Sequence, residues 1–114
     1  MSQREMDPQE TRRQIGMMNV LAISGGRVVL DTPEGERYAD ILLPVSSGYR
    51  VRISLRSDDT YTVTREMKRG DRLFVKGVQT YVFFDEVGEV AYQASSYKSN
   101  DFGDARIARH TVGA

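Results

Sequence analysis

Apolar and polar side chains alternate strictly over residues 49–56, and this alternation constrains the fold more than any other feature of the chain. A period of two is typical of a β-strand that buries one face and leaves the other in water. A second stretch of the same kind, 60–68, follows the polar turn Ser57-Asp58-Asp59. The two stretches therefore predict an antiparallel hairpin. Its buried face would hold Tyr49, Val51, Ile53 and Leu55, and its polar face Arg50, Arg52, Ser54 and Arg56.

Signals for a helix and for further strands lie on both sides of this hairpin. Asp7 suits an N-cap, Pro8 the first helical position and Gly25 a left-handed C-terminal residue, so we expect one helix over about 8–23. The last segment, 85–96, fits a helix or a strand, and the alternation of its apolar residues favours the strand. Strands are predicted over 27–30, 37–43, 49–56, 60–68, 73–84 with a bulge at Gly77, and 89–96.

These elements predict an α+β fold, in which the N-terminal helix packs on a five- to six-stranded antiparallel meander sheet or small open barrel. The chain has 114 residues, the length of one ordinary domain, and we place that domain at residues 1–97. We expect residues 98–114 to form a flexible C-terminal tail, docked only through Phe102. The chain has four Phe, six Tyr and no Trp, and we expect most of these rings in the core, including Tyr49 and Tyr61.

Charge is balanced over the whole chain but not along it. The 16 basic and 16 acidic side chains give a formal net charge of zero, so no global field attracts nucleic acid or membrane. Residues 49–76 carry eight Arg or Lys against four acids, whereas residues 85–104 carry five acids against Lys98 alone. This segregation predicts one basic and one acidic region on the surface.

The residues with catalytic or ligand-binding chemistry are few. There is no cysteine, which excludes disulfides and thiolate chemistry, and the single histidine, His110, lies in the expected tail, where nothing would orient it. Ser24-Gly25-Gly26 follows the predicted helix instead of preceding it, which is typical of a C-cap and not of a phosphate-binding loop. We therefore predict a protein that is not an enzyme, with no catalytic residue, metal site or cofactor.

The longest apolar runs fall far short of the roughly 20 residues that span a bilayer, and the polar N-terminus resembles no targeting signal. We therefore expect a cytoplasmic protein with no membrane partner.

Two surfaces are candidates for binding. Basic side chains on the polar face of the hairpin and at the turn after it form a strip that could follow phosphates or meet an acidic protein. Two aromatic residues near the end of the next strand form a candidate patch, and a sheet with aromatic residues on both faces leaves a homodimer open. The basic strip comprises Arg50, Arg52, Arg56, Lys68, Arg69 and Arg72, and the aromatic patch Tyr81 and Phe83.

Three segments together resemble a known group of proteins: Leu21-Ala-Ile-Ser-Gly-Gly-Arg27, Asp59-Thr-Tyr-Thr-Val63 and Gly88-Glu-Val-Ala-Tyr-Gln-Ala-Ser95. Their order and spacing are similar to small accessory proteins of actinobacteriophages (mycobacteriophage-type), whose function is unassigned. The resemblance covers about residues 15–97 and implies a phage protein in a bacterial cytoplasm, but it carries no catalytic residues.

From the residues and this resemblance we predict a non-enzymatic accessory protein, most simply a protein-interaction module for a host or phage protein. The alternatives are a nucleic-acid-binding accessory protein that uses the basic face, and an anti-defence protein that sequesters a small nucleotide signal.

Overall fold

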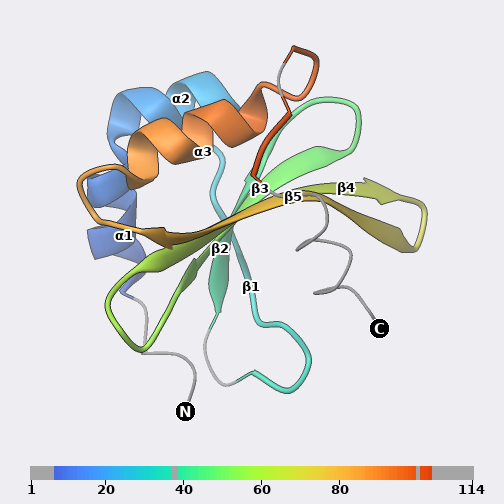
Figure 1. Ribbon diagram of the computed structural model, residues 1–114. Helices are drawn as coiled ribbons and strands as arrows, with labels where there is room; N and C mark the ends of the chain where they lie inside the picture. The colour runs from blue at the N-terminus through green and yellow to red at the C-terminus, as the bar shows by residue number, and fades with distance from the viewer. Residues whose placement is uncertain (1–6, 37–38, 100, 104–114) are drawn as a thin grey trace.

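The computed structural model describes residues 7–36, 39–99 and 101–103, and it shows an α+β fold in two layers (Figure 1). Helices pack against one face of a five-stranded antiparallel sheet, as the sequence predicts. No helix in the described ranges is long and apolar enough to cross a membrane. Along the chain the elements are α1 (Pro8–Ile15), α2 (Met17–Ser24), β1 (Val29–Asp31), β2 (Asp40–Pro44), β3 (Tyr49–Leu55), β4 (Tyr61–Arg69), β5 (Arg72–Val82) and α3 (Val87–Ser95).

The sheet is a meander in which neighbouring strands follow each other along the chain. Its central hairpin has the predicted parity, since Val51 and Ile53 are fully buried on the helix side while Arg52 pairs with Thr64 on the other face. The predicted bulge beside Gly77 is present, where the β4–β5 register shifts at Arg65. The first two strands begin later than predicted, β1 at Val29 and β2 at Asp40, and residues 37–38 of the predicted second strand lie outside the described residues.

The N-terminal helical segment consists of two helices, so the single helix predicted over 8–23 is wrong. Asp7 caps α1 as expected, because its carboxylate accepts hydrogen bonds from the backbone N–H groups of Gln9 (3.0 Å) and Glu10 (3.5 Å). The break lies at Gly16, whose φ of 93° no helix allows and only glycine adopts without steric cost. Gly25, at φ 65°, ends α2 in the left-handed conformation that its position predicts.

Residues 87–95 form helix α3, so the strand predicted over 89–96 is also wrong. Val87, Val90, Ala91 and Ala94 are all buried, which is the i, i+3, i+4, i+7 spacing of an amphipathic helix. The helix also depends on a tertiary contact, because a side chain on Gly88 would collide with the backbone carbonyl oxygen of Ile15 at the end of α1. The sheet therefore has five strands, and α3 completes the helical layer that covers it (Figure 1).

The core between the layers is aliphatic. Among the described aromatic residues only Tyr61 and Phe102 are buried, so the prediction that most rings lie in the core is wrong. A buried cation contacts the end of this core: Arg65 donates hydrogen bonds to the backbone oxygens of Ala94 (2.7 Å) and Gln93 (3.2 Å). These carbonyls belong to the last turn of α3, where helical N–H partners run out, and the Gln93 oxygen also accepts the Ser96 N–H (3.1 Å). The largest fully buried side chains include Ile15, Val20, Ile41, Leu43, Val51, Ile53, Val63, Val82 and Val87.

The segment after α3 returns to the sheet. Phe102 is buried against Gly77, where any side chain would meet the Phe102 backbone, and the Arg65 guanidinium lies 5.5 Å from its ring centroid. Docking through Phe102 is what the sequence predicts for the tail. Residue 100 and residues 104–114, including His110, lie outside the described residues.

Candidate functional site

Two arginines of the predicted basic strip lie in a network of ion pairs on the open face of the sheet. Arg50 pairs across the hairpin with Glu66 (2.8 Å). Arg52 pairs with the other oxygen of Glu66 (2.8 Å) and also with Asp40 and Asp31, both at 2.9 Å. The centre of the polar face is therefore a set of neutralised charges, and these two arginines do not present free cations to a ligand.

The network is largely withdrawn from water. The exposed fraction of the side chain is 12% for Arg52, 5% for Glu66 and 3% for Asp40. Burial by itself lowers the pKa of Arg52, but the hydrogen bonds and charge of Glu66, together with Asp40 and Asp31, raise that pKa by more, so its net shift is upward. Removing one member of such a group leaves an uncompensated charge in a site of low polarity.

A hollow of about 290 Å³ lies over this network. Its floor holds the Arg52, Glu66 and Asp40 side chains, and its rim includes Glu36 and Pro33 of the β1–β2 loop. Arg56, which is exposed, also lines the hollow, but the three carboxylates of Glu36, Asp40 and Glu66 outnumber the two arginines. An anionic ligand needs a lining with an excess of cations, so this hollow is unsuited to a nucleotide phosphate.

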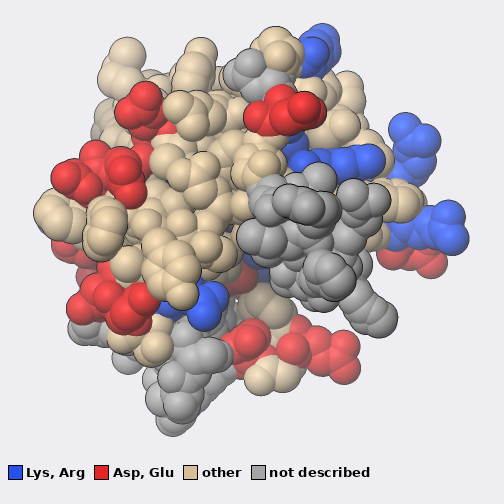
Figure 2. Space-filling model, viewed as in Figure 1, with Lys and Arg blue, Asp and Glu red and all other residues tan. Residues whose placement is uncertain are grey.

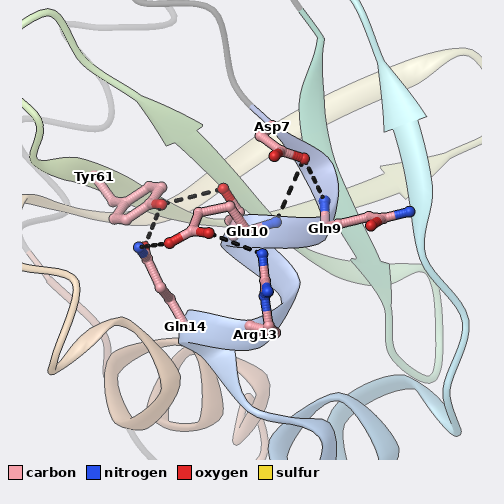
Figure 3. A network of polar contacts seen from close by, with 7 residues as sticks. Asp7, Gln9, Glu10, Arg13, Gln14 and Tyr61 are labelled. Atoms are coloured by element: carbon pink, nitrogen blue, oxygen red, sulfur yellow. Dashed lines mark hydrogen bonds and ion pairs between the residues drawn. The ribbon is translucent and has the colours of Figure 1, made fainter.

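A second polar network joins α1 to β4. Tyr61 and Gln14 point toward one another (Figure 3), and the Tyr61 hydroxyl donates to Gln14 Oε1 and lies 3.1 Å from Thr11 Oγ1. Glu10 accepts hydrogen bonds from Arg13 (2.9 Å) and Gln14 (3.2 Å). Burial is the main cause of a raised pKa for Tyr61, to which the charge of Glu10 also contributes. This network holds the first helix at its place on the sheet.

Tyr61→Phe is expected to lower the free energy of unfolding by about 1–2 kcal/mol, because Thr11 keeps a buried hydroxyl without that partner. A raised pKa in the folded state means that folding favours the neutral phenol. The neutral phenol of Tyr61 therefore contributes to the free energy of unfolding below the unfolded pKa of about 10, and this contribution is lost as pH rises through the folded pKa. Alkaline titration by phenolate absorbance should show a late-ionising component that is lost in Tyr61→Phe and retained in Tyr92→Phe, a change at an exposed ring. A titration curve that Tyr61→Phe leaves unaltered would contradict this.

Aromatic side chains project from the junction of β5 and α3. The exposed fractions are 67% for Tyr81, 56% for Phe83 and 62% for Phe84. We call these three residues the aromatic corner. The sequence singled out Tyr81 and Phe83, and the structure adds Phe84, which also lines a second hollow beside Glu10 and Asp59.

A second β-bulge shapes the aromatic corner. Tyr61 pairs with Val82 and Val63 with Gln79, so Thr80 and Tyr81 together oppose one residue of β4. Tyr81 has φ 57°, the left-handed conformation that a bulky residue rarely adopts. Two hydrogen bonds between Phe83 and Glu86 hold the turn that connects β5 to α3. The Phe83 N–H donates to Glu86 Oε1 (3.0 Å), and the Glu86 N–H donates to the Phe83 carbonyl (3.0 Å).

The other members of the basic strip lie at two opposite ends of the sheet. Lys68, Arg69 and Arg72 are exposed around the β4–β5 turn, while Arg56 is exposed at the end of β3. Figure 2 shows Lys and Arg side chains gathered on the right, where Figure 1 places the β4–β5 turn, and Asp and Glu gathered on the left, beside the helices and the β5–α3 junction. The predicted strip is thus divided among a neutralised centre, an exposed basic end at the β4–β5 turn, and Arg56 beside the β3–β4 turn at the opposite end.

Sequence reasoning missed the acidic partners of the arginines. Glu66 could have been found, because a hairpin that turns at Asp58 sets positions 50 and 66 opposite each other, and opposite charges there attract. Asp31 and Asp40 reach Arg52 from β1 and β2, and their register carries no comparable signal in the sequence.

Similarity to known proteins does not add to this geometry: no family model, curated protein or solved structure matches the chain.

Proposed function

We propose that this chain is a non-enzymatic interaction module that binds a host or phage protein through the aromatic corner. The resemblance to actinobacteriophage accessory proteins is the source of the proposed partner class. The observation that carries the proposal is the exposure of three aromatic rings within the four residues 81–84. Large aromatic side chains are the residues that most often dominate binding energy at protein interfaces.

The backbone at Tyr81 supports the same conclusion. A left-handed, non-glycine residue costs on the order of 1–3 kcal/mol, and such strain is concentrated at functional sites. The Tyr81 side chain is two-thirds exposed, so its burial within the chain does not offset that cost. A glycine would suit this backbone better, and the presence of tyrosine is accounted for if the ring contacts a partner.

The charge around the aromatic corner indicates the chemistry of the partner. Asp85, Glu86 and Glu89 follow the rings in sequence and are exposed, and the same side of the molecule is predominantly acidic (Figure 2). Complementary charge at the rim of an interface increases the association rate and excludes wrong partners. The partner surface should therefore combine an apolar pocket with basic residues around it.

The experiment compares wild-type protein with Tyr81→Gly as baits in an actinobacterial lysate, followed by titration of the captured protein in purified form. Tyr81→Gly removes the ring and relieves the backbone strain, so its stability should equal or exceed that of wild type. Binding should weaken by at least about 30-fold, which corresponds to a hot-spot loss of about 2 kcal/mol.

Phe74→Ser is the matched control, because it removes an exposed ring at the opposite end of β5. It should leave capture of the protein unchanged. Equal capture by wild type and Tyr81→Gly would refute the proposal. Sedimentation at increasing concentration tests the homodimer: self-association that Tyr81→Gly abolishes would identify a second copy, instead of a host or phage protein, as the partner.

A further inference from the structure

A row of three aromatic rings and one methionine crosses the sheet near the β4–β5 turn. Met67 of β4 pairs with Tyr49 of β3 on one side and with Phe74 of β5 on the other, which places all three on the helix-side face. Tyr97, after α3, stacks on Tyr49 with ring centroids 3.9 Å apart and planes inclined by 13°. Phe74 is exposed, and Tyr49, Met67 and Tyr97 are half-buried. The row is a platform at the boundary of the helical layer.

Cations flank this platform on both sides. Arg69 pairs with Arg72 two residues further along the same face, at a two-residue turn in which Gly70 has φ 63°. Lys76 follows Phe74 along β5, on the side away from the β4–β5 turn, and its Nζ lies 5.5 Å from the centroid of the Phe74 ring. All three cations are exposed. We call Arg69, Arg72, Lys76 and Phe74 the basic ribbon.

The basic ribbon differs from the network around Arg52 in two respects. Its cations are exposed instead of buried among carboxylates, and an aromatic ring stands between them. Proteins that bind single-stranded nucleic acid without sequence preference combine cations that contact the backbone with aromatic rings on which bases stack. An acidic peptide would need the cations but not the aromatic platform, and duplex bases are not free to stack on a protein ring.

We propose that the basic ribbon binds single-stranded nucleic acid, with Arg69 and Arg72 on phosphates and Phe74 stacked on a base. This is a second binding surface and does not depend on the aromatic corner. The two surfaces lie at opposite ends of β5, which spans about 30 Å at ~3.3 Å per residue (Figure 1). Both can be occupied at once, so the protein would connect a nucleic-acid strand to a protein partner.

The test is fluorescence-anisotropy titration of a labelled oligo-dT strand and of a duplex of the same length. The two phosphate contacts of Arg69 and Arg72 predict about 7-fold weaker binding of the single strand at 200 mM salt than at 50 mM. Arg69→Glu with Arg72→Glu should weaken binding at least 30-fold. Phe74→Ser should weaken it by about 5-fold or more, because base stacking on the ring is removed.

Arg12→Glu with Arg27→Glu is the matched control, because it makes the same charge change at exposed arginines outside the ribbon. It should bind like wild type. Absence of binding at 50 mM salt, equal loss in this control, or a preference for the duplex would overturn the proposal. If wild type binds no nucleic acid and the double variant Arg69→Glu with Arg72→Glu no longer captures the protein partner, the ribbon is a protein-binding surface instead. Tyr81→Gly should retain nucleic-acid binding, so failure at one surface is distinguishable from failure at the other.

Discussion

Arg52→Met is expected to lower the free energy of unfolding by about 3–5 kcal/mol, as measured by urea denaturation at neutral pH. Arg52 contacts three carboxylates, and two of them, Glu66 and Asp40, are almost fully buried. Methionine fills most of the space of the arginine stem but cannot compensate these charges. The size of the loss comes from the anions left behind and not from the ion pairs themselves.

The deficit of Arg52→Met should shrink as the pH is lowered. Lowering the pH protonates carboxyl groups and so removes the uncompensated anionic charge on which the loss of stability depends. The difference from wild type is therefore largest at neutral pH.

Arg50→Met is the matched control for Arg52→Met. Arg50 contacts Glu66 alone in the network, and Glu66 keeps its bond to Arg52, so the loss should be about 1 kcal/mol. Equal losses for the two variants would show that Arg52 is not the centre of the network.

Val51→Asp is expected to abolish the cooperative unfolding transition. Val51 is fully buried between the sheet and the helices. Its cross-strand neighbour Arg65 already donates to the Ala94 and Gln93 carbonyl oxygens of α3, so a carboxylate at position 51 would stay unpaired or draw Arg65 away from α3. Burying an unpaired charge costs several kcal/mol, and the burial of the valine's apolar surface no longer stabilises the fold. The sum approaches the whole stability of an ordinary domain, about 5–15 kcal/mol. Circular dichroism and thermal melting should show an unfolded chain.

Ser54→Asp tests the same strand from its other face. Ser54 is half-buried, opposite Thr62 and on the polar side of β3, so a carboxylate there can reach water. We expect a folded protein with a change in stability of about 1 kcal/mol or less. A folded Val51→Asp, or an unfolded Ser54→Asp, would mean that the parity of β3 is inverted.

The positions where local sequence rules work are those where a local interaction decides the structure. The alternation over 49–56 gave the correct faces of β3, and Asp7 and Gly25 mark helix ends because their bonds lie within a few residues. The candidate surfaces were recognised only in part. Tyr81 is exposed as predicted, yet nothing local indicated the bulge that orients it.

The chain by itself determined an antiparallel sheet with one apolar and one polar face, since the side-chain period of a strand is a property of local geometry. Tertiary structure decided the rest. It made residues 87–95 a helix, because Gly88 packs against the end of α1. It also gave the arginines different environments, because Asp31 and Asp40 meet Arg52 from two other strands, whereas Arg69 and Arg72 are exposed. Contacts between residues distant in sequence depend on register and layer packing, which no local pattern encodes.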